Sequence, residues 1–207
     1  MIYVLQISIL IFSVIIHEVA HGYVAYTRGD NTAKLAGRLT LNPIPHIDVF
    51  GSIILPLCLM LCHAPVFGWA KPVPVNSRYF KNYKKDIILV SIAGVTANFL
   101  LAIAASILMF IIRITLTDDS SILVSAHYLL QYVVVINVVL GVLNLIPIPP
   151  LDGSRVFFFM LPKDLAYKYA KLEPYGFFII FALLAIGVLD KILVPIINLI
   201  ITILFKF

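Results

Sequence analysis

The hydrophobic residues of this chain fall into long runs that polar residues seldom interrupt. A membrane crossing needs about 20 mostly apolar residues, and segments 2–27, 87–112 and 122–146 each reach that length. Segment 174–206 is also apolar, and a charged pair near its middle predicts two helices joined by a tight turn, with one long, broken helix as the alternative. The pattern therefore predicts an all-α polytopic membrane protein with about five transmembrane helices.

Two shorter stretches depart from this pattern. Segment 53–62 is an apolar run of ten residues that contains a proline, which is short for a span and predicts a re-entrant segment. The stretch 37–48 contains alternating and β-branched residues and predicts a small β hairpin at the membrane surface. No linker divides the chain, so residues 1–207 are expected to form a single domain, with a core at 1–155 and C-terminal helices at 174–206.

Composition excludes a water-soluble monomer. Hydrophobic residues make up 62 % of the 207 residues and charged residues only 12 %, and the mean hydropathy is +1.07. A soluble domain is usually about a quarter charged. The net charge of +5 suits basic loops that face an anionic leaflet. We therefore expect the lipid bilayer as a partner and expect no nucleic acid.

The basic residues predict an orientation. If segment 53–62 re-enters on one side, 13 basic residues share a side and 2 remain on the other, whereas a full crossing gives at best 10 and 5. The positive-inside rule favours the first arrangement, with the N-terminus outside and the C-terminus in the cytoplasm. The residues on the cytoplasmic side are then Arg28, Lys34, Arg38, Lys71, Arg78, Lys81, Lys84, Lys85, Arg155, Lys163, Lys168, Lys171 and Lys206.

Three ionisable residues lie close together in the first span, within the sequence His-Glu-Val-Ala-His. His17 and His21 are one helical turn apart and share a face, so both imidazoles can bind one Zn²⁺. Glu18 beside them can act as general base towards a bound water. The alternative is a polar face that lines a pore or packs against other helices. Each such group costs about 2–3 kcal/mol at mid-membrane, which favours a functional role.

A catalytic zinc site needs a third protein ligand, and Asp152 is the better candidate. It follows Asn144 and three prolines that break the helix at the end of the third span. The alternative is an ordinary helix-ending turn, and the residues alone leave both interpretations open. If segment 53–62 re-enters, the first and third spans run in the same direction. The two histidines and Asp152 then lie towards the same leaflet.

Five motifs in order resemble the site-2 protease family, the intramembrane zinc metalloproteases of peptidase family M50, in its compact prokaryotic branch. They are HEVAH, NPIPHIDVFG, FGWAKPVPVN, AGVTANFLLA and NLIPIPPLDGSR. The resemblance implies one Zn²⁺ per chain, held by His17, His21 and Asp152, with Glu18 as catalytic base. It also implies a site towards the cytoplasmic side and cleavage of transmembrane helices in membrane-protein substrates. One departure is Val95, where such proteins often have proline.

Two amides in apolar spans remain to be explained. Asn98 and Asn144 are candidates for binding the substrate or its oxyanion, and interhelical hydrogen bonding is the alternative for each. A second class of function is a metal-ion or proton transporter whose path is lined by the His-Glu-His face. Such a transporter is expected to contain inverted repeats, and the sequence has no visible repeat.

Overall fold

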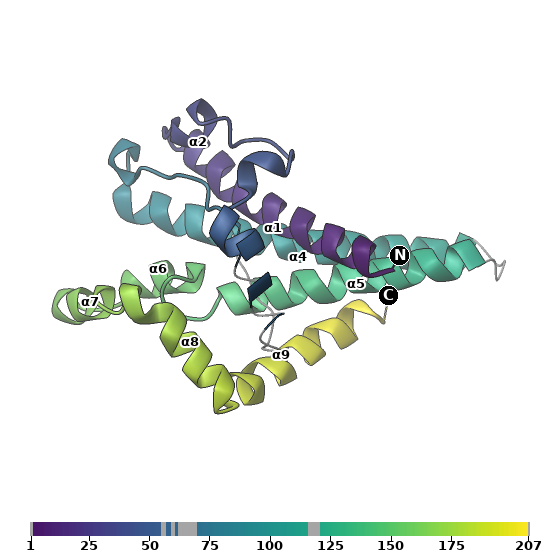
Figure 1. Cartoon of the computed structure of the whole chain (residues 1–207). Coiled ribbons are helices and arrows are strands. Elements are labelled where there is room, and N and C mark those ends of the chain that lie inside the picture. The colour runs from purple at the N-terminus through teal and green to yellow at the C-terminus, as the bar shows by residue number, and fades with distance from the viewer. Residues whose placement is uncertain (1, 55–56, 59–60, 62–69, 116–120, 207) are drawn as a thin grey trace.

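The computed structural model describes residues 2–54, 57–58, 61, 70–115 and 121–206. Its three long helices are α1 (Ile2–Thr27), α4 (Tyr83–Thr115) and α5 (Ser121–Asn144), which run alongside one another (Figure 1). All three are long and apolar enough to cross a membrane. The three clear spans predicted from hydropathy are thereby confirmed.

Shorter elements connect and cover these helices. They are α2 (Thr32–Leu35), the 3₁₀ helix η1 (Ile44–His46), the π-helical η2 (Val49–Ile54), the 3₁₀ helix η3 (Ser77–Tyr79), α6 (Asp152–Phe158), α7 (Lys163–Ala170), the 3₁₀ helix η4 (Glu173–Tyr175), α8 (Gly176–Ala185) and α9 (Val188–Leu204). In Figure 1, α2 lies at the C-terminal end of α1, and α6 and α7 lie beyond the C-terminal end of α5.

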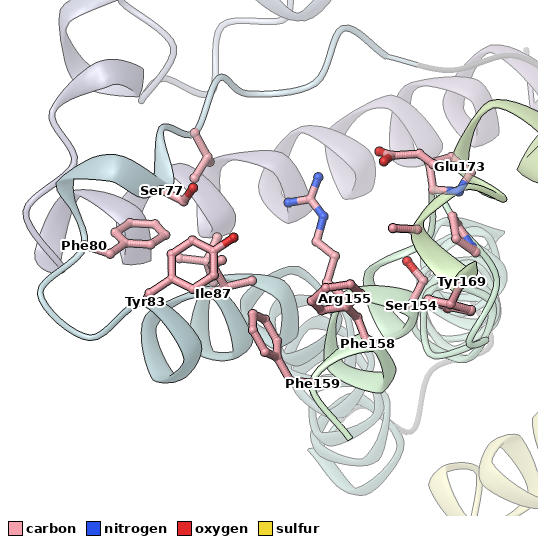
Figure 2. A pocket seen from close by; sticks show the side chains of 15 residues that line it. Ser77, Phe80, Tyr83, Ile87, Ser154, Arg155, Phe158, Phe159, Tyr169 and Glu173 are labelled. Carbon is pink, nitrogen blue, oxygen red and sulfur yellow. The ribbon is translucent and has the colours of Figure 1, made fainter. Parts of the chain in front are cut away.

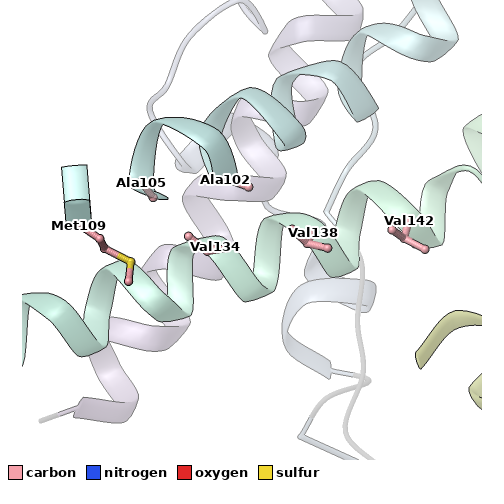
Figure 3. Close-up of a cluster of buried hydrophobic side chains, with 6 residues drawn as sticks. All are labelled: Ala102, Ala105, Met109, Val134, Val138 and Val142. Atoms are coloured by element: carbon pink, nitrogen blue, oxygen red, sulfur yellow. The ribbon is translucent and has the colours of Figure 1, made fainter. Parts of the chain in front are cut away.

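Small and β-branched side chains form the contact between α4 and α5. Ala102 and Ala105 of α4 meet a row of valines on α5 at intervals of four residues, and Met109 extends the contact (Figure 3). The valines are Val134, Val138 and Val142. Lipid tails are as apolar as these side chains, so association within a bilayer depends on close packing, which small residues permit.

The C-terminal segment forms two helices, as predicted, but their junction lies at Ile186–Gly187. Neither α8 nor α9 reaches 18 residues, and the stretch Lys163–Ala185, which ends with α8, forms with α9 one candidate span bent by 81°. The described residues therefore contain three candidate spans, or four with the bent pair, and the predicted number of about five stays a prediction. Helix α9 packs on α4 and α5, and the Ser106 hydroxyl donates to the carbonyl of Leu204. The C-terminus thus lies towards the end of the bundle where α1 begins (Figure 1).

The predicted β hairpin is wrong. Residues 37–48 form turns, bends and the 3₁₀ helix η1, and no residue that the structure describes is in a strand. Pro43 and Pro45 have no N–H to donate. The neighbouring segment 70–76 is also rich in proline, and the bond from Lys71 N to His46 O is an isolated one (2.9 Å). Two proline-rich segments cannot form a ladder. Half of the predicted re-entrant segment 53–62 lies outside the described residues, so its path stays a prediction.

Buried charged side chains hold segment 70–76 beside α1. Asp30 is fully buried and accepts hydrogen bonds from the backbone N–H of Thr32 (2.9 Å) and of Asn76 (2.6 Å). Arg38, also buried, donates to the carbonyl of Lys71 (2.6 Å). These bonds fix an extended segment that has no ladder of its own.

Replacing Asp30 by Ala is expected to destabilise the protein by about 2 kcal/mol, because the backbone amides of the half-buried Thr32 and Asn76 lose their acceptor. It should also expose segment 70–76 to proteases. Thermal unfolding and limited proteolysis in detergent micelles measure both effects. Asn31→Ala is the matched control, since the Asn31 side chain is exposed and makes no capping bond. Equal stability of the two variants would contradict this role of Asp30.

Candidate metal centre

His17 and His21 lie on one face of α1, and their Nε2 atoms are 3.0 Å apart. The rings are nearly perpendicular, at 87°, and their centroids are 4.6 Å apart. The side chains expose only 8 % and 12 % of their surface. Both rings therefore point at a single position inside the bundle.

Hydrogen bonds at the Nδ1 atoms determine whether each Nε2 carries a proton or a lone pair. His17 Nδ1 donates to Asn98 Oδ1 (2.6 Å), and His21 Nδ1 donates to the backbone carbonyl of Val90 (2.6 Å). An oxygen of a carbonyl group can only accept, so each Nδ1 carries a proton. In a neutral ring the Nε2 atom then has a lone pair.

The end of α5 brings Asp152 to the same position. Prolines after Asn144 stop the helix, Leu151 is extended, and α6 begins at Asp152. The Asp152 Oδ2 atom lies 3.1 Å from both Nε2 atoms, and the side chain is 14 % exposed. A Cβ on Gly153 would lie 2.2 Å from the carbonyl oxygen of Leu145, so glycine is required for this close approach.

These three atoms fit a metal ion. Asp152 Oδ2 is buried and has no hydrogen-bond partner. Because each Nδ1 donates to a carbonyl oxygen, the Nε2 atoms of two neutral rings present lone pairs beside this oxygen, within 4.8 Å of one another, and a cation would relieve their repulsion. Two nitrogens and one carboxylate oxygen are common Zn²⁺ ligands, and tetrahedral ligands at 2.0–2.1 Å are roughly 3.3 Å apart. No other group of three such side chains converges in the described part of the chain.

Gly94 of α4 leaves the space that an ion needs. A Cβ at this position would lie 2.5 Å from His21 Nε2 and 2.6 Å from His17 Nε2. Any side chain would therefore enter the space between the imidazoles. The sequence contains no signal for this role, because a glycine in an apolar helix is not unusual.

Glu18 is oriented by the backbone of segment 70–76. Its Oε2 atom accepts a hydrogen bond from the N–H of Val73 (2.8 Å), and the side chain is half-buried. Pro72 and Pro74 flank Val73, so Val73 contributes the N–H between two residues that have none. The sequence had not suggested this contact.

The two candidate amides have different surroundings. Asn98 is fully buried, with Oδ1 on His17 and Nδ2 donating to Asn137 (2.8 Å). Asn144 is half-buried at the end of α5, and its Nδ2 donates to the carbonyl of Leu140 (3.0 Å). A role for either amide in binding substrate stays a prediction. The contacts of Asn98 favour the orientation of His17.

A cavity of about 320 Å³ adjoins the centre, and Figure 2 shows its lining. Val90, whose carbonyl binds His21, lies on its wall together with Ser154, two residues beyond Asp152. Arg155 and Glu173 also line it, among aromatic side chains. The cavity therefore has polar groups on its wall, and two of its lining residues are neighbours of His21 and Asp152.

Comparison with known proteins identifies related sequences. The model of peptidase family M50 matches residues 108–187. Three relatives share the description "Putative zinc metalloprotease". YwhC of Bacillus subtilis is 38 % identical over 91 % of this chain and 84 % of its own length. Rip2 of Mycolicibacterium smegmatis is 27 % identical over 92 % of this chain and 70 % of its own length. Rip2 of Mycobacterium tuberculosis is 28 % identical over 84 % of this chain and 58 % of its own length. No solved structure matches the chain.

Gly94→Ala is expected to abolish metal binding, because its methyl group would occupy the space between the imidazoles. Zinc content should fall to about a tenth of wild type or less, since the ligands can no longer approach a common centre. Elemental analysis of the purified protein measures it. Thr96→Ala is the control, because Thr96 is exposed and bonds only within α4. A full complement of zinc in Gly94→Ala would rule out this position for the ion.

Proposed function

Because this chain belongs to peptidase family M50 and is an intramembrane zinc metalloprotease, we propose that His17, His21 and Asp152 hold its one zinc ion and that Glu18 is the catalytic base. The convergence of His17 Nε2, His21 Nε2 and the buried Asp152 Oδ2, which has no hydrogen-bond partner, carries this assignment. Nothing in the comparisons favours a transporter, since the relatives are described as metalloproteases.

The proposed chemistry is hydrolysis of a peptide bond. When bound, zinc supplies a lowered pKa for water and polarisation of the substrate carbonyl. Glu18 accepts a proton from the water as the water oxygen bonds to the carbonyl carbon. It then delivers that proton to the amide nitrogen as the C–N bond breaks, so that a carboxyl group and an amine leave the site.

The hydrogen bond from Val73 gives the two carboxylate oxygens of Glu18 different roles. Its N–H engages Oε2 at 2.8 Å, which restrains rotation of the carboxylate. Oε1 is then the oxygen that takes the proton from water. Segment 70–76 therefore positions the base through its backbone, and the buried side chains of Asp30 and Arg38 support it.

The substrate is a protein in a membrane context, and we propose that the bond cut lies in or near one of its transmembrane helices. Water must reach a site that lies among apolar helices. We propose that water enters through the cavity beside Val90 and Ser154, at the end of the bundle that carries α6 and α7. We also propose that residues 1–207 act as one domain, which the packing of α9 on α4 and α5 supports.

For the topology we propose an N-terminus outside and an active site towards the cytoplasm. The basic residues of the loops after α1 and α5 support this orientation. For the C-terminus, the count of basic residues favours the cytoplasm, whereas the packing of α9 favours the outside. We adopt the outside, because the bond from Ser106 to Leu204 draws the end of α9 away from α6.

Glu18→Gln is expected to retain zinc and to lower proteolysis about 10²- to 10⁴-fold, the usual contribution of a general base. The neutral amide still accepts the Val73 N–H but cannot take a proton from water. Elemental analysis measures the zinc, and comparison of membrane proteomes detects membrane spans that accumulate uncut. Asp164→Asn, an exposed change on α7, is the control. Unchanged fragments in Glu18→Gln would refute the assignment of the base.

Cysteine labelling in intact cells tests the topology. With Cys58 and Cys62 replaced by Ser, an impermeant maleimide should label Thr115→Cys and Lys206→Cys. It should label Lys168→Cys only after lysis, since α7 lies on the cytoplasmic side. Labelling of Lys168→Cys without lysis would contradict the proposed orientation. Protection of Lys206→Cys from labelling would show that the C-terminus lies in the cytoplasm.

A further inference from the structure

The bond between His17 and Asn98 is one end of a longer buried chain. Asn98 Nδ2 donates to Asn137 Oδ1 (2.8 Å), and Asn137 Nδ2 donates to the carbonyl of Val133 (2.9 Å) and to Ser13 Oγ (2.9 Å). Asn98 and Asn137 are fully buried, and Ser13 is 3 % exposed. The chain joins α1, α4 and α5, and it ends on the imidazole of His17.

The orientation of every amide in this chain follows from one backbone carbonyl. The oxygen of Val133 can only accept, so the Asn137 atom facing it is the donor Nδ2. The Asn137 Oδ1 atom therefore faces Asn98 and accepts a hydrogen bond from the Asn98 Nδ2. The Asn98 oxygen is thereby left for His17.

His17 is the last member of this relay. An oxygen on its Nδ1 requires a proton on that nitrogen and leaves the lone pair on Nε2, the atom 3.1 Å from Asp152 Oδ2. His21 needs no such relay, because its Nδ1 binds the backbone carbonyl of Val90 directly. The two histidines thus reach the same tautomer by different means. The tautomer of His17 depends on the Asn98 side-chain amide, whose orientation is set by Asn137.

We propose that Asn137 is a positioning residue that sets the tautomer of His17 and, through it, the affinity for zinc. This inference rests on the proposed metal centre. Without Asn137 the Asn98 amide has no fixed acceptor, so it can turn its Nδ2 towards His17. His17 then carries its proton on Nε2 and cannot bind a metal through that atom.

The test compares two replacements of similar size. Asn137→Leu removes both hydrogen-bonding ends. Asn137→Asp, neutral because the site is fully buried, keeps a carbonyl oxygen for Asn98 and an O–H for Val133. In detergent micelles, with a zinc-chelating dye as competitor, Asn137→Leu should bind zinc about 10- to 100-fold more weakly, as is usual when a partner of a metal-binding His is lost. Asn137→Asp should stay within about threefold of wild type by the same criterion.

A packing control separates positioning from general destabilisation. Val138→Ala removes two methyl groups from the fully buried neighbour of Asn137 without touching the chain of hydrogen bonds. It should lower thermal stability and leave zinc affinity unchanged. Equal weakening of zinc binding in Val138→Ala and Asn137→Leu, or equal weakening in Asn137→Asp and Asn137→Leu, would overturn the proposal.

Nitrogen NMR of labelled imidazoles reads the tautomer directly. In metal-free wild-type protein His17 should carry its proton on Nδ1, and in Asn137→Leu a substantial population should move to Nε2, while His21 stays unchanged. An unaltered His17 spectrum in Asn137→Leu refutes the relay even if zinc binding weakens. Wild-type protein that binds no zinc would instead refute the metal centre itself, so the two failures are distinguishable.

Discussion

Three acceptor atoms that face one another inside an apolar bundle are the constraint on which this structure depends. Two are imidazole nitrogens of α1 and the third is the carboxylate oxygen of Asp152, from the turn after α5. A cation relieves the repulsion between these acceptors, because buried charged groups are stabilised by pairing or by metal coordination. The arrangement therefore agrees with the zinc chemistry of the family.

The surrounding helices satisfy this constraint with groups that cannot change their hydrogen-bonding character. Backbone carbonyls of Val90 and Val133 accept and never donate, and from them follow the proton positions on His21 and, through two amides, on His17. A backbone group also orients the proposed base, because the Glu18 carboxylate accepts the N–H of Val73, which lies between two prolines. Backbone groups thus orient His21 and Glu18 directly and His17 through two amides.

The sequence predicts the parts of the structure that depend on local chemistry. Hydrophobic runs predicted α1, α4 and α5, because a span must be apolar over its whole length. Helical spacing placed two histidines on one face, and three prolines marked the turn that presents Asp152. The hairpin at 37–48 failed because the alternating pattern does not reveal whether a neighbouring segment can supply N–H groups. Contacts such as that of Asn137 with Asn98 depend on which faces of separate helices meet, and no spacing within one helix reveals that.

The division of the metal centre along the chain has a consequence for biosynthesis. In the proposed assignment the base and two ligands emerge from the ribosome first, on α1, and the third ligand follows only after α5. A chain that is still being inserted into the membrane would therefore lack a complete centre. On this assignment no bond can be cut before α5 and the turn after it have been synthesised.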